Sequence, residues 1–440
     1  TAVRDGGSVF VVGDILGNFL AQDITIERSV AGRYGGGIHL GRHVANSDTH
    51  SALLKDIMAS SSSAKVGGAI YIDDDNPGLK MRNAEIVSCN ASYRGGGLFV
   101  GSAGHDGEFH GVTVDHCHAT LHGGGIFLRG LATKVLLDGL TVKNSIAGGM
   151  GGGIFLDRGF TDVELSALEL HNNRADYGGG AYINYDMADL RIDRARVTAN
   201  NASGDGGGIY ISERVLSSSV TNTIIAQNSA GGNGGGVFVG TTVGDADIRM
   251  TGTAHANDHF LMDNVSLHEN NAGDGGGMYV SQWNALALWD VDVAGNKADT
   301  DGAGISLYTS NWLYLRDSKL DMNVAGSCGG GLSTQGKSNA VTLEDVTATN
   351  NSAGYGGGAI SINGDSSLEF GGDILVSHNL AKFWGGGLLL NDAKLFTYNE
   401  SRTTNDVVLA KNTAERGSAL ALMAISEHES FPEANFTLKL

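Results

Sequence analysis

The chain has 440 residues, of which 68 are glycine, only 2 are proline and 41% are apolar. This apolar share is sufficient for a folded core, and the glycines lack the three-residue period of collagen. The net charge of -19 argues against nucleic acid and anionic membrane surfaces as partners. No run of 18 apolar residues occurs, so we expect no transmembrane segment.

Two further features bound the class of protein. The first residues, Thr1 to Asp5, resemble neither a signal peptide nor a start region with an initiator methionine. We therefore expect the chain to begin inside a longer or processed polypeptide. Its three cysteines are too few for a disulfide-dense scaffold.

Glycine triplets recur along the chain at intervals of 27 to 32 residues, apart from one interval of 41. Full triplets begin at Gly35, Gly95, Gly123, Gly151, Gly178, Gly206, Gly234, Gly275, Gly329, Gly356 and Gly385, and degenerate ones at Gly6, Gly67, Gly302 and Gly417. Fifteen copies of one unit therefore cover residues 1–440, which we predict to form one continuous domain. The long interval holds a loop insertion at residues 241–262, and we expect an irregular C-terminal end at residues 423–440.

Each unit contains a triplet, a short aliphatic run, a variable polar loop and two short alternating runs. Alternation with a period of two and abundant Val, Ile, Thr and Tyr predict strands, whereas no segment keeps a helical period for three turns. Three short strands in each repeat of ~28 residues, in register with the next repeat, predict an all-β fold. The expected architecture is a single right-handed parallel β-helix, a solenoid of about 15 coils.

An asparagine stands about six residues before most triplets. We expect an Asn ladder at an inward turn, because stacked amides can bond to one another and to backbone groups. The expected ladder residues are Asn172, Asn200, Asn228, Asn296, Asn323, Asn350 and Asn379, with Asn90, Asn144, Asn270 and Asn412 displaced by one residue.

The pairing of GG[AG][ILV] with an upstream aliphatic-x-x-Asn resembles the repeat of polymorphic outer membrane proteins, whose units carry GGA[ILV] and FxxN. Here Gly67-Gly68-Ala69-Ile70 matches the first motif, and Val197-Thr198-Ala199-Asn200 parallels the second. The Phe of FxxN is replaced by an aliphatic residue in most units. The resemblance implies a β-helix in an extracellular or cell-surface setting and a role in adhesion, and it implies no catalytic residue.

An aromatic residue occupies the middle of the strand that follows the triplet in eight successive units. Its aliphatic neighbours should point inward, so alternation should direct the rings outward. An exposed aromatic stripe of this kind would bind a protein partner or a sugar ring. Alternatively, the rings could fold over the adjacent glycines and cover their own sheet. The stripe residues are Tyr71, Phe99, Phe127, Phe155, Tyr182, Tyr210, Phe238 and Tyr279.

A column of acidic residues directly precedes four consecutive triplets, at Asp205, Asn233, Asp274 and Asp301. Stacked carboxylates repel unless a proton or a cation lies between them, so Asp205, Asp274 and Asp301 form a candidate metal site in which calcium is possible. Together with His259 beside the insertion, the same three carboxylates are the alternative catalytic residues of a polysaccharide lyase or glycoside hydrolase. Alternatively, Asp often precedes Gly in ordinary turns, and this turn preference would explain the column equally well.

Residues 331–338, GLSTQGKS, satisfy the phosphate-loop pattern GxxxxGK[ST]. That motif requires a helix whose N-terminal amides hold phosphate, whereas a strand pattern follows here. We therefore expect no nucleotide site at this segment.

Two kinds of covalent modification are compatible with the repeat. Cys89 and Cys117 stand at equivalent positions in adjacent units, within reach of a disulfide, while Cys328 has no such partner. Asn264 and Asn399 lie in glycosylation sequons in or near long loops, where an acceptor would be accessible and the chain would be a glycoprotein.

These patterns together favour a noncatalytic structural or adhesive scaffold. Even repeats explain the whole chain, whereas an enzyme explains only the insertion and the acidic column. We expect a segment of a larger surface protein or filamentous assembly, whose partner is a protein or a further copy of the chain. A carbohydrate-active enzyme or a glycan-binding module near the acidic column is the alternative.

Overall fold

The computed structural model describes the chain apart from residues 14, 16–17, 45–51, 75, 102–105, 131–132, 245–258, 398–405, 424–436 and 440. The described residues form strands and turns and contain no helix, so the all-β prediction is confirmed. None of the described segments is a helix that could cross a bilayer. The chain divides into two compact units, Thr1–Ser218 and Ser219–Leu440.

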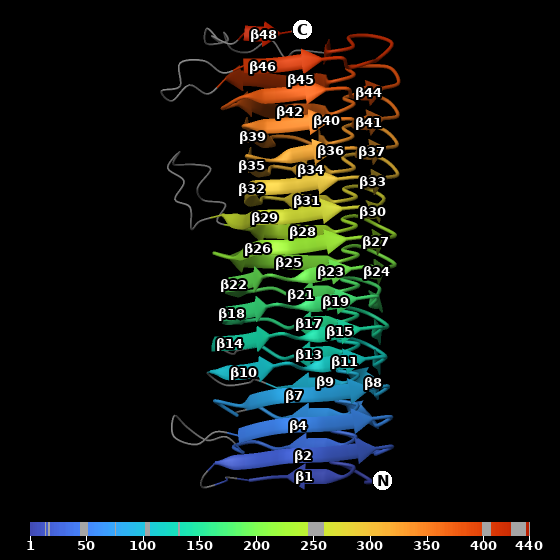
Figure 1. Ribbon diagram of the computed structural model, residues 1–440, viewed down its shortest axis with the longest axis vertical. Helices are drawn as coiled ribbons and strands as arrows, with labels where there is room; N and C mark the ends of the chain where they lie inside the picture. The colour runs from blue at the N-terminus through green and yellow to red at the C-terminus, as the bar shows by residue number, and fades with distance from the viewer. Residues whose placement is uncertain are drawn as a thin grey trace. The chain divides into compact units, whose positions relative to one another are not determined.

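Both units are parallel β-solenoids in which every coil presents three faces (Figure 1). The glycine face is the strand that directly follows a triplet. The long face comes next, as one long strand or as two strands separated by a bend, and the short face is a two- to five-residue strand near the asparagine position.

The unit Thr1–Ser218 stacks strands of equivalent coils in parallel register, as in Ile126↔Ile154 on the glycine face. Its glycine face contains β1 (Val9–Val11), β3 (Ile38–Leu40), β6 (Ile70–Ile72), β9 (Leu98–Val100), β13 (Ile126–Leu128), β17 (Ile154–Leu156), β21 (Ala181–Ile183) and β25 (Ile209–Leu216). Its long face contains β2 (Phe19–Glu27), β4 (Ala52–Ser60), β7 (Lys80–Val87), β10 (Gly107–His110), β11 (Thr113–Asp115), β14 (Thr133–Asp138), β15 (Thr141–Lys143), β18 (Thr161–Ser166), β19 (Glu169–His171), β22 (Met187–Asp193) and β23 (Arg196–Thr198). Its short face contains β5 (Ser63–Val66), β8 (Asn90–Arg94), β12 (His118–Ala119), β16 (Ile146–Ala147), β20 (Arg174–Ala175) and β24 (Asn201–Ala202).

The unit Ser219–Leu440 repeats this arrangement. Its glycine face contains β28 (Val237–Val243), β31 (Met278–Gln282), β34 (Ile305–Thr309), β38 (Leu332–Thr334), β42 (Ile360–Phe370), β45 (Leu388–Thr397) and β47 (Leu420–Met423), of which β42 and β45 run on into the long face. Its long face also contains β26 (Ser219–Ala226), β29 (Phe260–His268), β32 (Ala285–Ala294), β35 (Trp312–Arg316), β36 (Lys319–Asp321), β39 (Ala340–Glu344), β40 (Val346–Thr349), β43 (Ile374–Ser377), β46 (Asp406–Ala410) and β48 (Thr437–Lys439). Its short face contains β27 (Ser229–Ala230), β30 (Asn271–Ala272), β33 (Lys297–Ala298), β37 (Val324–Ala325), β41 (Ser352–Ala353) and β44 (Leu380–Ala381).

The structure has about 13 turns of about 28 residues, slightly fewer than the 15 that the triplets predict. The difference lies at the two ends of the chain. The first and last triplets, at Gly6 and Gly417, belong to incomplete turns, because Ala2 and Thr413 make only isolated bridges where complete turns have a short-face strand. Most of the predicted insertion, residues 245–258, lies outside the described residues.

The glycine triplet is a tight corner, whose first position is a glycine with positive φ in every described coil. In a typical coil Gly123 has a φ of +64°, a conformation that side chains disfavour. A Cβ on Gly124 would lie 2.3 Å from the carbonyl oxygen of Gly152 in the next coil. The triplet therefore permits close backbone stacking between coils, as the sequence suggested.

A buried polar ladder lines the corner between the long and short faces. In the unit Ser219–Leu440 it consists of asparagines, and Asn296 shows the repeated bonding. Its Oδ1 accepts the backbone and side-chain N–H groups of Asn270, both at 3.0 Å, while its Nδ2 donates to the Leu267 carbonyl at 2.8 Å. The residues are Asn228, Asn270, Asn296, Asn323, Asn351, Asn379 and Asn412.

Three ladder residues, Asn144, Asn172 and Asn350, were predicted one position too early, and Asn90 was predicted one position too late. Ser145 and Cys89 hold the buried positions in the coils of Asn144 and Asn90. Asn172 and Asn350 are exposed and adopt φ angles of 52° and 54°, whereas Asn173 and Asn351 are buried in the ladder. The corner requires a residue with positive φ immediately before each inward amide, and Asn is one of the few side chains that tolerate this conformation. The Asn-Asn pairs in the sequence therefore combine a turn residue with a ladder residue.

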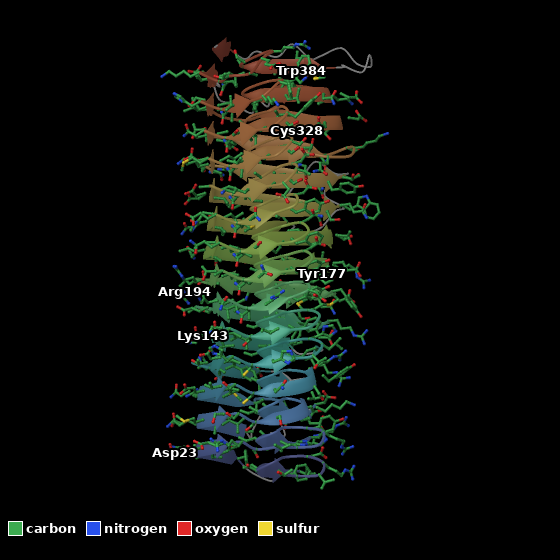
Figure 2. All side chains as sticks on the ribbon, turned by 90° about the vertical axis from the view of Figure 1, so that its right-hand side faces the viewer. Asp23, Lys143, Tyr177, Arg194, Cys328 and Trp384 are labelled. Carbon is green, nitrogen blue, oxygen red and sulfur yellow. The ribbon has the colours of Figure 1, made fainter. Side chains whose placement is uncertain are left out.

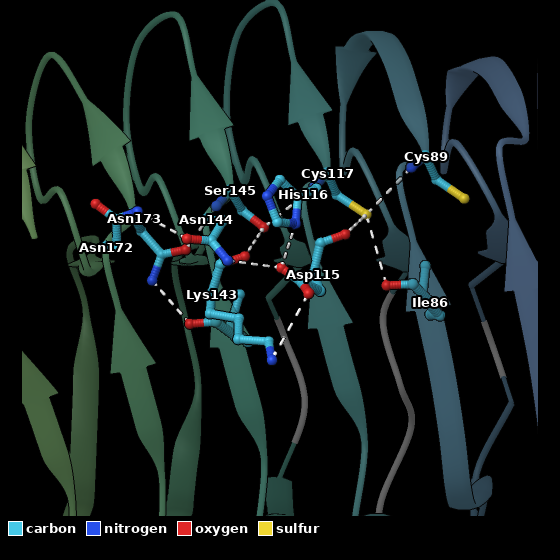
Figure 3. A network of polar contacts seen from close by, with 11 residues as sticks. Ile86, Cys89, Asp115, His116, Cys117, Lys143, Asn144, Ser145, Asn172 and Asn173 are labelled. Carbon is cyan, nitrogen blue, oxygen red and sulfur yellow. Dashed lines mark hydrogen bonds and ion pairs between the residues drawn. The ribbon is translucent and has the colours of Figure 1, made fainter.

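In the unit Thr1–Ser218 shorter side chains continue the same ladder (Figure 3). The backbone N–H of Cys117 donates to Ser145 Oγ at 3.4 Å, and that of Ser145 donates to Asn173 Oδ1 at 2.9 Å. The backbone N–H of Cys89 lies 3.4 Å from Cys117 Sγ. Serine and cysteine thus replace asparagine as the acceptor at this corner.

A second asparagine ladder, which the sequence analysis missed, starts the long face in the unit Ser219–Leu440. Asn284 Nδ2 donates to Asn311 Oδ1 at 3.0 Å, and Asn311 Nδ2 donates to Asn339 Oδ1 at 3.3 Å. Each is preceded by a residue with positive φ, as in the first ladder. The spacing of about one repeat between these asparagines is the signal that could have revealed them.

Asn323→Ala is expected to destabilise the unit Ser219–Leu440 by about 3 kcal/mol. The substitution leaves two N–H donors of Asn296 and the Val293 carbonyl without their partner, and each buried unsatisfied group costs roughly 1–3 kcal/mol. Urea denaturation followed by circular dichroism measures the change. Asn271→Ala, at an exposed position of β30 without a positive φ, is the matched control and should cost less than about 0.5 kcal/mol. Equal effects of the two substitutions would contradict this role of the ladder.

Candidate functional site

The predicted aromatic residues form one continuous stack on the glycine face of the unit Thr1–Ser218. Successive rings of Tyr71, Phe99, Phe127, Phe155, Tyr182 and Tyr210 lie 4.6 to 5.3 Å apart, with interplanar angles of 8° to 14°. Parallel register places each ring above the equivalent ring of the next coil, as in Phe127↔Phe155. The column of rings that the sequence predicted is therefore present.

The rings do not form an exposed stripe, and that part of the prediction is wrong. The first five are only 1% to 7% exposed, and Tyr210 is partly buried. The residue before each triplet covers the ring of the following coil. Tyr34 stacks on Tyr71 at 4.6 Å, and Arg94 lies over the Phe127 ring at 5.3 Å. The outward face of this strand is therefore a second, smaller core.

The aromatic column is replaced by serine in the unit Ser219–Leu440. Phe238 and Tyr279 are stacked at 5.4 Å and are each 8% exposed, so they too are buried rather than exposed. The next three coils place Ser306, Ser333 and Ser361 at the same position, in register with one another. These serines are fully buried, and Asp301, Gln335 and Cys328 lie against them where rings lie elsewhere.

A groove of about 510 Å³ lies over this serine segment, and we call it the serine groove. Figure 2 labels Cys328, which lines the groove, and Trp384. Cys328, Gly356 and Trp384 are successive members of the column of residues that directly precede the triplets. Seven of the ten lining residues are polar, one is aromatic and two are apolar. The polar residues are Asp301, Ser327, Cys328, Thr334, Gln335, Asn363 and Asn391, and the others are Tyr355, Leu389 and Met423.

The groove also depends on a one-residue shift in the triplet. Pairing of Leu332 with Ile360 shows that Gly357, not Gly356, is the first glycine of its corner. Gly356 therefore occupies the column of covering residues and has no side chain to cover the next coil; a Cβ there would lie 2.6 Å from Leu389. Tyr355 is displaced to the surface, where it is 42% exposed.

Asp301 is the acidic residue of the groove. Its Oδ1 accepts the backbone N–H of Cys328 at 2.7 Å, and its Oδ2 accepts the Gln335 side-chain amide at 3.2 Å. Burial raises the pKa of this carboxyl, and the nearby Asp274 charge raises it further. Burial therefore disfavours the ionised form of Asp301, and a carboxyl with such a shifted pKa often marks a functional group.

The acidic column does not unite the residues that were predicted to share a cation or perform catalysis. The Asp274 carboxylate accepts hydrogen bonds from the Thr300 hydroxyl and, at 2.9 Å, from the backbone N–H of Asp301. Asp205 belongs to the other unit. His259 is buried where β29 begins, with its ring stacked on Trp312 at 4.7 Å, at a different corner from the triplets. Over the part of the chain that the structure describes, no three His, Cys, Asp or Glu side chains are placed to hold a metal.

One hydroxyl beneath the groove lacks a hydrogen-bond partner. Ser306 Oγ accepts from Gln335 at 3.4 Å, and Ser361 Oγ accepts from Asn363 at 3.0 Å. Ser333, between them, is fully buried, and its Oγ has no partner among the described residues. Because its strand neighbours Leu332 and Thr334 occupy the inward positions, Ser333 Oγ lies on the side of β38 that faces the groove.

Comparisons with known proteins assign no family to this chain, because no protein family and no curated protein sequence matches it. Among solved structures, a siphovirus 9NA tailspike receptor-binding domain shares 10% identity with a TM-score of 0.32, covering 94% of this chain and 74% of that one. A TibC-catalysed hyper-glycosylated TibA fragment shares 12% identity with a TM-score of 0.24, covering 91% of this chain and 98% of that one.

The cysteines are free, so the predicted Cys89–Cys117 disulfide is not formed. Both thiols are buried in the ladder. Cys89 Sγ donates to the Val87 carbonyl at 3.3 Å, and Cys117 Sγ donates to the Asp115 carbonyl at 3.6 Å. Each thiol also approaches a carbonyl of the preceding coil, that of Ala59 for Cys89 at 3.8 Å and that of Ile86 for Cys117 at 3.9 Å. The bonding requirement of the ladder thus explains the equivalent positions of these cysteines.

The segment with the phosphate-loop pattern forms β38, a turn at Gly336 and then β39. A strand follows the glycines where the motif would need a helix. Of the two predicted glycosylation acceptors, Asn264 is exposed on β29 and donates to Asn222 at 2.8 Å, whereas Asn399 lies outside the described residues. Modification of Asn264 stays a prediction.

His122→Phe is expected to reduce the loss of stability on acidification. His122 stacks on Phe155 at 5.1 Å, and its Nδ1 accepts the Met150 N–H. Burial, followed by the Arg94 charge, lowers its pKa from 6.5 to about 4. Below pH 6.5 the unfolded chain takes up a proton that the folded chain does not, so stability falls as the pH drops from 6.5 to 4. Melting temperatures at pH 7, 6 and 5 test this, with exposed His118→Phe as control. A parallel decline in wild type and His122→Phe would contradict it.

Native alkylation with iodoacetamide at pH 8.5 is expected to modify one cysteine. Cys328 is partly accessible, although burial raises the pKa of its thiol and slows the reaction, whereas Cys89 and Cys117 are buried. Intact mass should show one adduct on the folded chain, none on folded Cys328→Ser and three on the wild type in urea. An unreduced wild-type chain that takes one adduct in urea would instead indicate a disulfide between Cys89 and Cys117.

Proposed function

We propose that the protein is a noncatalytic adhesive scaffold of the cell surface or extracellular space that binds an external ligand through the serine groove. The observation that carries this proposal is the interruption of an otherwise continuous covering. Where other coils seal the glycine face with stacked rings, three serines and Gly356 leave a polar concavity. Its volume is within the range of ~300–1,000 Å³ that is usual for ligand sites.

Binding fits the lining better than hydrolysis. Glycoside hydrolysis needs two carboxyl groups about 5 to 9.5 Å apart across the scissile bond. Asp301 is the one carboxylate among the described residues that line the groove. Asp274, the nearest member of the acidic column, already accepts hydrogen bonds from Thr300 and Asp301. The carbohydrate-active enzyme therefore has weaker support than the binding scaffold.

The solenoid also suits a scaffold mechanically. Backbone hydrogen bonds and ladder amides join successive coils, so a ligand held in the groove transmits load to many strands at once. In this proposal the partner is bound at the serine groove rather than at an aromatic stripe, because the rings of that stripe are covered by their neighbours.

Ser333→Phe is expected to abolish adhesion while preserving the fold. The substitution restores a ring at a position where Phe99 and Phe127 already fit the same backbone, and it fills the groove from below. Beads carrying the full chain are tested on glycoprotein-coated surfaces. Retention by the variant should fall at least tenfold, with an unchanged circular dichroism spectrum and an equal or higher melting temperature.

Leu380→Phe places the same ring at a position on the short face that is 50% exposed and lies outside the groove, and it is the matched control. Beads carrying this control should adhere like wild type, and the coated glycoprotein should keep its mass after incubation. Undiminished adhesion of Ser333→Phe would contradict the proposed site, and shortened glycans would favour the enzyme.

A further inference from the structure

The lining of the serine groove contains hydrogen-bonding groups suited to hydroxyls. Asp301, Asn363 and Asn391 bring carboxylate and amide oxygens as acceptors, and the Asn391 amide also brings N–H donors, whereas Asn363 Nδ2 already donates to Thr334 and Ser361. A carboxylate accepts hydrogen bonds, and a side-chain amide both accepts and donates them, so together they can bind adjacent hydroxyls of one sugar ring. No Lys or Arg is among the described residues that line the groove, so it offers no counter-ion to an acidic ligand.

The electrostatics select further against anions. The chain carries a net charge of -19, and the Asp301 carboxylate lies in a partly buried position where its field is poorly screened. A uronate, sulfate or sialate group in this groove would meet like charge without a basic partner. A neutral ligand incurs no such repulsion.

The lining of the groove also offers an aromatic surface. Tyr355 is 42% exposed, and the Phe383 ring lies 5.9 Å from it at an interplanar angle of 57°. Leu389 and Met423 add apolar contacts. Exposed tyrosine beside amide and carboxylate groups matches a sugar ring, which has C–H groups on its faces and hydroxyls at its edge.

The unpartnered hydroxyl of Ser333 is an independent indication of a ligand. A fully buried polar group without a partner costs roughly 1–3 kcal/mol, and such groups are few in folded proteins. The residue before each triplet covers the following coil. Asp301, which is bonded to Gln335, therefore lies with it beside Ser333, and Cys328 interacts with Ser361. A hydroxyl bound between these groups would supply the missing hydrogen bond.

We propose that the ligand of the serine groove is a neutral glycan with free vicinal hydroxyls, an inference that rests on the proposed binding function. Asp301 accepts from one hydroxyl, the amides of Asn363 and Asn391 bind its neighbours, and Tyr355 packs against the face of the ring. Bound glycan lies over Cys328 and Ser333 and shields the thiol from solvent.

Isothermal titration of the full chain with neutral oligosaccharides, and with uronate, sulfated and sialylated counterparts of equal size, tests the ligand class. We expect saturable binding of at least one neutral glycan and at least tenfold weaker binding of the anionic ones. Asp301→Asn and Tyr355→Ala should each weaken neutral binding about tenfold. Asp365→Asn and Tyr308→Ala, exposed in the same unit and outside the groove, should bind like wild type.

A second readout locates the bound glycan. Saturating neutral glycan should slow native alkylation of Cys328 at least fivefold, and an anionic glycan at the same concentration should not. Neutral binding that Asp301→Asn and Ser333→Phe leave unchanged would overturn the proposed ligand site, as would tighter binding of the anionic series.

The outcomes separate this inference from the proposed function. If Ser333→Phe abolishes adhesion while no neutral glycan binds, and enzymatic deglycosylation of the coated surface leaves wild-type adhesion intact, the groove binds the polypeptide. In that case the ligand class is wrong and the scaffold function stands. If Ser333→Phe adheres like wild type, the groove itself is the wrong site.

Discussion

Parallel register between successive coils is the constraint on which the rest of each unit depends. Every side chain lies above the equivalent side chain of the next coil, so a residue is stable only if it is compatible with its own column. Asparagines succeed because each amide accepts from the coil before it and donates both to a carbonyl of that coil and to the asparagine of the next coil. Aromatic rings succeed because they stack at about 5 Å. The triplets make this stacking possible by removing every Cβ from the tightest corner.

The same constraint explains how a site can arise without a dedicated domain. The glycine face is sealed wherever a ring and its covering residue are both large. Replacing rings by Ser306, Ser333 and Ser361, and a covering residue by Gly356, opens a groove while the backbone continues unchanged. Backbone hydrogen bonds and the ladder carry the stability, so the outward column is free to vary. Function in such a scaffold is encoded by interruptions of a column rather than by motifs.

Much of this architecture could be predicted from the sequence, because every repeat carries the same local conformational preferences. The period, the all-β class, the triplet corner and the existence of an asparagine ladder followed from spacing alone. Finer assignments failed where two residues compete for one role. Asn172 and Asn173 are both suited to the corner, and only the backbone conformation shows which one turns the chain and which one enters the ladder. The shift from Gly356 to Gly357 is the same problem in a run of equal residues.

By itself, the sequence determined the columns: which residues recur, at what spacing, and therefore which must stack. Only the tertiary structure decided whether a column is exposed, because exposure depends on the side chain that the neighbouring coil places over it. Alternation correctly directed Phe127 outward, yet Arg94 of the preceding coil covers its ring. Three serines that looked like losses from an aromatic column lie fully buried beneath the groove. A local pattern fixes the direction of a side chain, but burial is a property of the coils packed around it.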